Sequence, residues 1–288
     1  MTNYLRKILI TGGNGQLANA LRAQNIDDTF QLFICNKQEL DITDMLSIDA
    51  AFVKYSPDII VNAAAYTAVD QAEIDADQAL LVNEIGAKNI AIACEKNKIP
   101  LIHFGTDYIF DGKKTSPYHE NDTANPLNIY GKSKYLGEEM IRKYCEKHII
   151  LRVSSVFSEY GHNFFKTISK LACEQKVLKV VKNQIITPTY AGHISDVTYS
   201  LIKNFSRNGT YHYCDTPSVS WYEFAVAIIE KAKQHPSFLV EKILPVTEME
   251  YKRRAVRPAY SVLACDKLER DYGIKQADWM SGLNKNRP

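Results

Sequence analysis

A tyrosine and a lysine stand four residues apart in the segment Tyr130-Gly131-Lys132-Ser133-Lys134. On a helix this spacing puts both side chains on one face, one turn apart. A free phenol loses its proton at about pH 10, so by itself it is a poor acid or base at neutral pH. A nearby ammonium favours the phenolate and lowers the pKa of the phenol. The pair therefore predicts a proton relay in which Tyr130 and Lys134 are catalytic.

A glycine-rich turn, Thr11-Gly12-Gly13-Asn14-Gly15-Gln16-Leu17-Ala18, follows an apolar segment at the start of the chain. Gly12 permits a tight turn, and Gly15 lets backbone amides approach a pyrophosphate at the N-terminus of the next helix. Such turns also occur for packing alone, but the position directly after a strand favours a dinucleotide. Together the turn and the Tyr130–Lys134 pair indicate hydride transfer.

The end of the second predicted strand bears on the choice of cofactor. Dinucleotide-binding folds usually carry an acidic residue there, which binds the ribose 2′-hydroxyl. In this chain the position falls near Asn36, followed by Lys37. An uncharged side chain beside a lysine does not repel a 2′-phosphate, which favours NADPH or no strong preference. The alternative is that Lys37 is a solvated surface charge.

Two further strand ends carry candidate site residues. The small side chains of Ala63, Ala64 and Ala65 would let an adenine or ribose pass close to the backbone, unless they serve tight packing alone. A hydroxyl at Thr106 is suited to hydrogen-bond a substrate carbonyl oxygen, stabilising the charge that develops there. His103 lies inside an apolar strand and is interpreted as a buried, hydrogen-bonded histidine rather than a base. Asp107 is either a turn cap or a contact to a sugar hydroxyl.

The elements that must position these residues alternate between short apolar runs and helical patterns. Strands are predicted at 7–11, 31–35, 58–62, 101–104 and 149–153, and helices from the glycine turn to about 24, from an N-cap in 41–44 to about 55, at 75–97, and around Tyr130. Runs of Ile, Leu and Val without polar alternation are typical of a parallel sheet covered on both faces. We therefore predict an α/β fold, a Rossmann doubly wound parallel sheet with its ligand at the carboxyl ends of the strands.

The pattern changes after residue 153, where a helix at 163–175, a strand at 209–214 and a helix at 221–233 are separated by proline-containing segments. We expect residues 1–155 to form the NAD(P)-binding Rossmann domain, completed by about 190–215. Residues 156–189 and 216–288 are expected to form a smaller, discontinuous C-terminal substrate-binding lobe over the strand ends.

Composition narrows the class of protein. The chain has 288 residues, 45% of them hydrophobic and 24% charged, which is typical of a soluble globular protein. Its net charge of +2 comes with dispersed basic residues and argues against a nucleic-acid partner. The six cysteines form no CxxC pair, which argues against a zinc site or disulfide framework and fits a reducing cytoplasm. No run approaches the roughly 18 apolar residues that a membrane span needs. We expect a cytoplasmic protein without a membrane partner.

Longer strings resemble the dTDP-4-dehydrorhamnose reductase family of the extended short-chain dehydrogenase/reductases, nearly from end to end. They are Gly15-Gln16-Leu17, Leu40-Asp41-Ile42-Thr43-Asp44, Asn62-Ala63-Ala64-Ala65-Tyr66-Thr67-Ala68-Val69-Asp70, Thr106-Asp107-Tyr108-Ile109-Phe110-Asp111-Gly112, Pro126-Leu127-Asn128-Ile129-Tyr130-Gly131-Lys132-Ser133-Lys134, Gly161-His162-Asn163-Phe164, Pro188-Thr189 and Arg257-Pro258. The string from Asn62 to Asp70 is far more specific than the catalytic residues, which many reductases share.

The resemblance implies reduction of the C4 ketone of dTDP-4-dehydro-β-L-rhamnose by NADPH or NADH, the last step of dTDP-L-rhamnose synthesis. It implies that Tyr130 protonates the nascent alkoxide and Thr106 orients the oxygen, while Lys134 binds the nicotinamide ribose and holds Tyr130 acidic. The cofactor positions are Gly12, Gly15, Gln16, Leu17, Asn36, Asp41, Ile42, Ala63, Ala64, Ala65, Phe104, Tyr130 and Lys134. The substrate positions are Thr106, Asp107, Ser155, Asn163 and Arg257, the last suited to pair with the diphosphate.

Three departures from the family pattern leave alternatives open. Gly105 stands where the family has a serine, and Ser155 replaces a tryptophan that faces the sugar, which changes how the hexose is held. The alternatives to dTDP-L-rhamnose synthesis are a 4-ketoreductase that forms another dTDP-6-deoxyhexose, such as 6-deoxy-L-talose, and a non-catalytic NAD(P)-binding regulatory subunit. The glutamates of the family's magnesium-linked dimer have no clear counterpart, so we predict no metal and leave a homodimer open.

Overall fold

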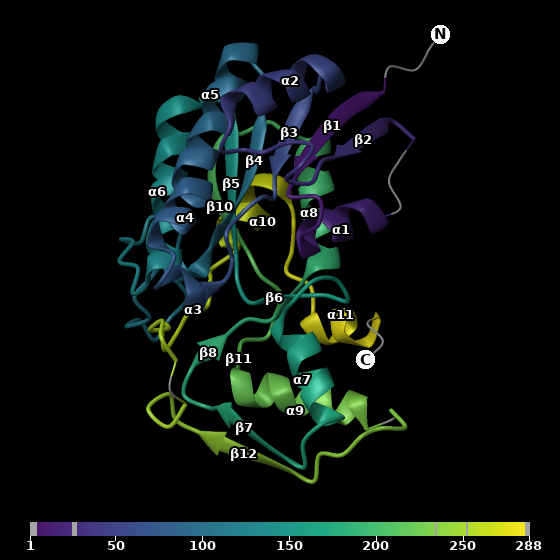
Figure 1. Ribbon diagram of the computed structural model, residues 1–288, viewed down its shortest axis with the longest axis vertical. Helices are drawn as coiled ribbons and strands as arrows, with labels where there is room; N and C mark the ends of the chain where they lie inside the picture. The colour runs from purple at the N-terminus through teal and green to yellow at the C-terminus, as the bar shows by residue number, and fades with distance from the viewer. Residues whose placement is uncertain (1–4, 25–27, 234, 252, 286–288) are drawn as a thin grey trace.

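A six-stranded parallel sheet forms the centre of the larger lobe, in the upper part of Figure 1. The computed structural model describes residues 5–24, 28–233, 235–251 and 253–285. The strand order is β10-β5-β4-β3-β1-β2, and each neighbouring pair runs parallel. The strands are β1 (Arg6–Thr11), β2 (Phe30–Ile34), β3 (Ile59–Asn62), β4 (Leu101–Thr106), β5 (His148–Val153) and β10 (Gly209–Tyr213).

Helices cover both faces of this sheet, because successive side chains of a strand point to opposite sides. Ile8 and Ile10 of β1 pack with α1 (Gln16–Ala23) and α8 (Ala191–Lys203). Leu9 packs on the other face with α2 (Met45–Tyr55), α5 (Ala87–Asn97) and α6 (Ile129–Tyr144). The predicted doubly wound fold is therefore confirmed.

A π-helical turn interrupts the single helix that was predicted at 75–97. The segment divides into α4 (Ala76–Leu80), the π-turn η1 (Leu81–Gly86) and α5. The wide turn presents Asn83 to α6, where its Nδ2 donates to the Ser133 hydroxyl at 2.9 Å. Gly137 permits this close approach, since a Cβ there would lie 2.1 Å from the Asn83 carbonyl oxygen. A second short helix, α3 (Val69–Ala72), precedes this region.

A smaller lobe lies below the carboxyl ends of the strands (Figure 1) and has its own apolar cluster. Phe157, Phe165, Phe224 and Trp279 are at its centre. Its elements are β6 (Val156–Phe157), α7 (Phe164–Ala172), β7 (Val177–Val181), β8 (Ile185–Ile186), β9 (Thr189–Tyr190), β11 (Val219–Ser220), α9 (Trp221–Ala232), β12 (Lys242–Val246) and α11 (Trp279–Lys285). The separate cluster supports the predicted smaller lobe, whose exact boundaries stay a prediction.

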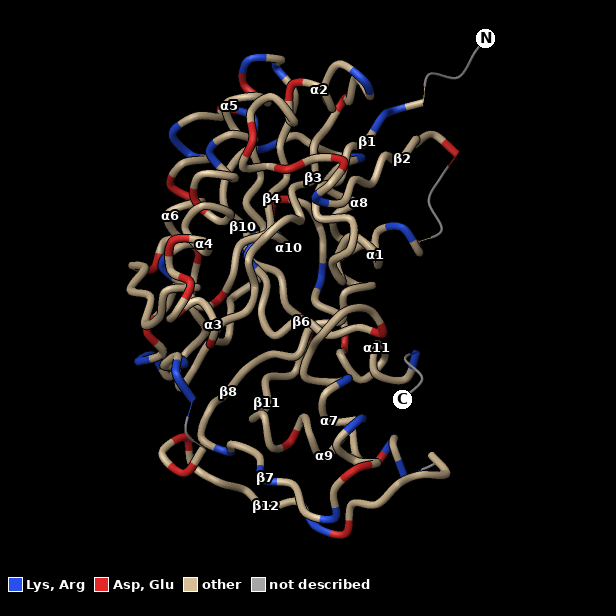
Figure 2. Tube along the Cα trace, in the orientation of Figure 1, with Lys and Arg blue, Asp and Glu red and all other residues tan. Residues whose placement is uncertain are grey.

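The C-terminal segment returns to the larger lobe. Leu268 of α10 (Asp266–Tyr272) lies in the apolar cluster of the parallel sheet, although the sequence pattern assigned 216–288 to the smaller lobe. In the described part of the chain, no helix has both the length and the apolar character needed to cross a membrane. Figure 2 shows acidic and basic residues interspersed over both lobes.

Candidate active site

A cleft of about 720 Å³ opens at the carboxyl ends of the parallel strands, where the smaller lobe meets the sheet. Most residues predicted for the site line it together: Gly12, Gly15, Gln16, Leu17, Asp41, Ile42, Ala63, Ala64, Ala65, Phe104, Thr106, Asp107, Tyr130, Lys134 and Ser155. They come from segments far apart in the sequence, so the fold and not local spacing brings them to one place.

The glycine turn has the geometry of a phosphate site. Gly12 has a φ of +69°, and a Cβ there would lie 2.7 Å from the Ala64 nitrogen, so a side chain is excluded on both grounds. Helix α1 begins at Gln16 with Gly15 as its N-cap, and no side chain caps it. Uncapped amides at a helix N-terminus attract phosphate oxygens. The turn therefore fits the pyrophosphate of a dinucleotide.

Lys37, and not Asn36, lines the cleft at the end of β2. The Oδ1 of Asn36 accepts hydrogen bonds from the backbone N–H groups of Gln38 and Glu39, at 2.9 and 3.2 Å. Asn36 thus shapes the turn that presents Lys37, whose Nζ lies 3.8 Å from an oxygen of Asp41. A contact of Asn36 with the cofactor stays a prediction.

Thr106 and Asp107 form a hydroxyl–carboxyl pair at the end of β4. The Thr106 hydroxyl donates to the Asp107 carboxyl at 3.2 Å, and the Ser154 hydroxyl donates to its other oxygen at 3.0 Å. Thr106 also caps the short 3₁₀ turn η2 (Asp107–Ile109) by accepting from the Tyr108 N–H. Burial raises the pKa of Asp107 to about 6, although the surrounding hydroxyls oppose this shift. Asp107 therefore orients the Thr106 hydroxyl within the cleft.

Tyr130 lies in the first turn of α6, which begins after the capping residue Asn128. The ring of Tyr108 packs edge-on against the ring of Tyr130, with centroids 5.7 Å apart. Burial raises the pKa of Tyr130, and the nearby Thr106 hydroxyl opposes this rise only in part. The expectation that Lys134 lowers the pKa of Tyr130 is thus wrong, since burial has the largest effect on this pKa and acts in the opposite direction. Tyr130 is a neutral phenol at neutral pH, the form that can give up a proton.

The Lys134 side chain contacts a backbone carbonyl group and an imidazole, and not the Tyr130 phenol. Its Nζ donates to the Phe104 carbonyl oxygen at 2.6 Å and lies 3.2 Å from the Nε2 of His103. The side chain is buried, and burial lowers the pKa of Lys134 to about 8 while the charge of Glu138 opposes the shift. Removal of water from the ammonium and the phenol explains why local spacing alone gave the wrong direction for Tyr130.

The cleft also contains an unpartnered hydroxyl and an aromatic ring. Ser155 has a φ of +43°, a left-handed conformation, and its buried Oγ has no hydrogen-bond partner among the described residues. Trp221, at the start of α9, also lines the cleft. Its ring packs on that of Phe164, with centroids 4.5 Å apart. Sequence reasoning missed Trp221, although the Ser220-to-Glu223 capping box placed it at the N-terminus of a helix.

Two predicted substrate residues, Asn163 and Arg257, do not line the cleft. Asn163 caps α7 and donates to the Ser158 carbonyl oxygen at 2.8 Å. Arg257 forms a bidentate ion pair with Asp70, with N–O distances of 3.2 and 2.7 Å. Their substrate roles stay predictions, and the structure gives both residues another task. The other lining residues that sequence reasoning did not select include Tyr66, Gln78 and His162.

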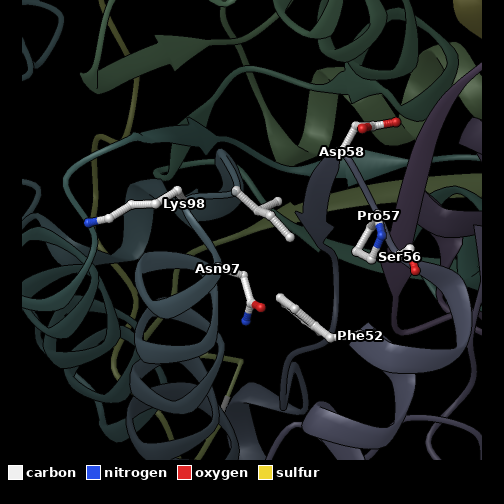
Figure 3. A pocket seen from close by; sticks show the side chains of 7 residues that line it. Phe52, Ser56, Pro57, Asp58, Asn97 and Lys98 are labelled. Atoms are coloured by element: carbon white, nitrogen blue, oxygen red, sulfur yellow. The ribbon is translucent and has the colours of Figure 1, made fainter. Parts of the chain in front are cut away.

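A second cavity, of about 450 Å³, lies before the amino end of β3 and thus at the opposite edge of the sheet from the cleft (Figure 3). It is lined by Phe52, Ser56, Pro57, Asp58, Asn97, Lys98 and Ile99. None of the predicted site residues is among them. The described residues also contain no group of three or more His, Cys, Asp or Glu side chains placed to hold a metal ion.

Comparisons with known proteins agree with this geometry. The family model described as RmlD substrate binding domain matches residues 6–286. A dTDP-4-dehydrorhamnose reductase of Aggregatibacter actinomycetemcomitans is 38% identical and covers 98% of this chain and 99% of its own. The spore coat polysaccharide biosynthesis protein SpsK of Bacillus subtilis (strain 168) is 41% identical, with coverage of 98% and 96%. A crystal structure of dTDP-4-dehydrorhamnose reductase from Bacillus anthracis in complex with NADP matches with a TM-score of 0.92 at 36% identity, over 98% of both chains. As the sequence predicted, the chain belongs to the dTDP-4-dehydrorhamnose reductase family.

Proposed function

We propose that the protein reduces the C4 ketone of dTDP-4-dehydro-L-rhamnose to dTDP-L-rhamnose with NADPH or NADH. The observation that carries this proposal is the convergence of Thr106, Tyr130 and Lys134 on the cleft that the glycine turn also lines. The relatives named dTDP-4-dehydrorhamnose reductase and the NADP complex of one of them support the substrate and the cofactor.

The side chains supply the proton chemistry of this reaction. Bound NADPH or NADH supplies the hydride that the C4 carbon takes up. Tyr130 donates a proton to the oxygen that becomes an alkoxide, and its raised pKa keeps that proton available at neutral pH. The Thr106 hydroxyl, whose proton is directed to Asp107 in this structure, would turn that proton toward the same oxygen to orient it. Lys134 would hold the nicotinamide ribose and, in its ammonium form, would return a proton to Tyr130 and become an amine.

The test is to mix the purified protein with NADPH and dTDP-4-dehydro-β-L-rhamnose and to identify the product by NMR. We expect oxidation of NADPH and formation of dTDP-L-rhamnose. A product with the other configuration at C4, dTDP-6-deoxy-L-talose, would overturn the assigned product and keep the reductase. NADPH that binds but is not oxidised with any dTDP-4-keto-6-deoxyhexose would favour a regulatory subunit.

Lys37 is expected to favour NADPH over NADH through the 2′-phosphate. Lys37→Ala should reduce the preference for NADPH by about fivefold to tenfold, because a largely exposed charge pair contributes on the order of 1 kcal/mol. The measurement is kcat/KM for both cofactors at low and high salt, since salt screens an exposed pair.

Lys96→Ala is the matched control, because Lys96 also pairs with an aspartate, Asp49 at 3.6 Å, but does not line the cleft. An unchanged cofactor ratio in Lys37→Ala would show that Lys37 is a solvated surface charge.

The site also suggests how the protein exists in the cell. We propose a cytoplasmic enzyme whose partner is the dTDP-4-keto-6-deoxyhexose itself, with no nucleic acid or membrane involved. A homodimer is the further proposal, and light scattering of the purified protein decides between a mass near the 32.7 kDa of one chain and twice that mass.

A further inference from the structure

A chain of buried hydrogen bonds links the catalytic lysine to the strand that precedes the glycine turn. The Ala64 N–H donates to the Thr11 hydroxyl at 3.1 Å, and this hydroxyl donates to the Asn62 Oδ1 at 2.6 Å. The Asn62 Nδ2 lies 3.0 Å from the Nδ1 of His103, whose Nε2 lies 3.2 Å from the Lys134 Nζ. Thr11, Asn62, His103 and Lys134 are all at most 3% exposed. The proposed reaction uses only the last member of this chain.

The donors and acceptors of this chain determine where the imidazole proton lies. Thr11 already accepts from Ala64, so its own proton goes to the oxygen of the Asn62 amide. The Asn62 nitrogen then donates to the Nδ1 of His103, which must accept. A neutral imidazole has one donor and one acceptor nitrogen, so the proton is on Nε2, facing Lys134. Burial keeps His103 neutral by lowering its pKa well below the ordinary value.

An Nε2–H group that faces Lys134 favours one protonation state of the lysine. An amine has a lone pair that accepts this hydrogen bond, whereas an ammonium would place one N–H group against another. The ammonium requires the reverse arrangement, with the His103 proton on Nδ1 and the Asn62 amide turned over. In that arrangement both the Ala64 N–H and the Asn62 Nδ2 point at the Thr11 hydroxyl oxygen. The proton of the Thr11 hydroxyl then loses its acceptor, the Asn62 Oδ1. The chain of hydrogen bonds therefore favours the amine.

We infer that His103, oriented by Asn62 and Thr11, is a positioning residue that sets the balance between the amine and ammonium forms of Lys134. The inference rests on the proposed reduction, in which Lys134 restores the proton on Tyr130. It gives the Asn62 side chain, which the family string includes but the reaction does not use, a defined task. It also connects the protonation of Lys134 to the backbone N–H of Ala64, the group that a Cβ on Gly12 would approach to 2.7 Å.

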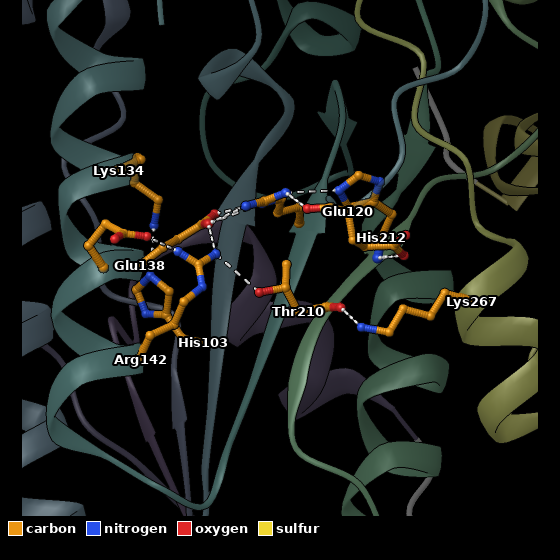
Figure 4. Close-up of polar contacts among 10 residues, drawn as sticks. His103, Glu120, Lys134, Glu138, Arg142, Thr210, His212 and Lys267 are labelled. Carbon is orange, nitrogen blue, oxygen red and sulfur yellow. Dashed lines mark hydrogen bonds and ion pairs between the residues drawn. The ribbon is translucent and has the colours of Figure 1, made fainter. Parts of the chain in front are cut away.

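Other titratable groups around Lys134 are already balanced by partners (Figure 4). Glu138, one turn further along α6, raises the pKa of Lys134, but Arg152 of β5 and Arg142 both pair with its carboxylate. Tyr130 on α6 is a neutral phenol. His148 of β5 has a smaller electrostatic effect on His103 than burial or Lys134, and burial lowers the pKa of His148 itself. Asp107 acts on Tyr130. From η1, the residue that bonds α6 next to Lys134 is Asn83, whose neutral amide donates to the Ser133 hydroxyl.

The experiment measures NADPH affinity against pH by fluorescence, without the sugar. The negative charges of a bound dinucleotide favour the ammonium form of Lys134. The affinity for NADPH is therefore highest below the pKa of Lys134, which is about 8, and falls by up to about tenfold per pH unit above it. His103→Gln supplies an amide oxygen that accepts from the ammonium, and should move this decline upward by about one pH unit. Asn62→Asp forces the His103 proton onto Nδ1, and should move the decline in the same direction.

His148→Gln is the matched control, because His148 is a buried histidine on the neighbouring strand whose Nδ1 bonds the Cys145 carbonyl oxygen and not Lys134. Its decline should match that of the parent protein. An unmoved decline in both His103→Gln and Asn62→Asp, with both proteins folded by circular dichroism, would overturn the inference. Since binding is measured without the sugar, a failure of ketone reduction would contradict the proposed function separately and leave this result intact.

Discussion

Replacing Tyr130 with phenylalanine is expected to lower kcat for ketone reduction by about 10²–10⁴-fold, the usual contribution of a positioned general acid. The change removes one oxygen and keeps the ring, so the edge-on packing against Tyr108 is retained. The raised pKa of Tyr130 keeps its proton in place near neutrality, and in the proposed reaction the alkoxide receives that proton. NADPH affinity should change little, since the pyrophosphate site at the glycine turn is untouched.

The measurement is kcat and KM from NADPH oxidation, with cofactor affinity determined separately by fluorescence. Tyr135→Phe is the matched control: Tyr135 lies on the same helix but does not line the cleft, so its kcat should equal that of the parent protein. Full activity in Tyr130→Phe would remove Tyr130 from the proton relay and leave Thr106 and Asp107 as the candidates for proton donation.

Local sequence patterns predicted the parts of the fold that depend on local physics. The apolar runs at 58–62 and 149–153 became buried strands β3 and β5, and the Tyr130 segment became α6. The glycine turn was predictable because Gly12 needs a positive φ and a close approach to Ala64. The short pairs β6–β9 and β8–β11 were not predicted, because two-residue strands carry no periodicity.

Contacts between distant segments were beyond prediction from one sequence. Arg257 was assigned to a diphosphate, but Asp70, 187 positions away, holds its guanidinium. Asn163 was assigned to the substrate, and the structure adds that its Oδ1 accepts from the Lys166 N–H at 3.1 Å and so caps α7. The predicted direction of the Tyr130 pKa shift was wrong, because the spacing of residues in the sequence reveals a neighbouring charge but not the loss of water around the phenol.

The contact between His103 and Lys134 shows the same limit in a functional residue. The position of His103 in an apolar strand correctly predicted a buried, hydrogen-bonded imidazole. The identity of the partners depends on β4 lying between β3 and β5 in the sheet, with α6 packed across them. Asn62 pairs in register with His103 on the adjacent strand, so the sheet itself builds this contact.

Glu138→Gln is expected to destabilise the protein by about 3–5 kcal/mol, the usual cost of removing one partner of a buried ion pair. The Glu138 carboxylate is fully buried and accepts from the Arg152 guanidinium at 2.8 and 3.0 Å. Among the described residues, Arg152, whose side chain is 4% exposed, also lies near the His212 imidazole, the Glu120 carbonyl oxygen and the Phe110 ring, none of which carries a negative charge. Without the carboxylate its positive charge is left buried. The measurement is the free energy of unfolding from urea titration, together with the midpoint of thermal unfolding.

Glu139→Gln is the matched control, since Glu139 follows directly, pairs with the same Arg142 and has a side chain 45% exposed. Its loss should change the free energy of unfolding by no more than about 0.5 kcal/mol, and salt should reduce even that difference. Equal effects of the two variants would mean that Arg142 and Arg152 are neutralised by other groups. Glu138→Gln should also move the decline of NADPH affinity to lower pH, because the Glu138 charge raises the pKa of Lys134. That shift is opposite in sign to the one expected for His103→Gln. One substitution therefore favours the amine form of Lys134 and the other favours its ammonium form.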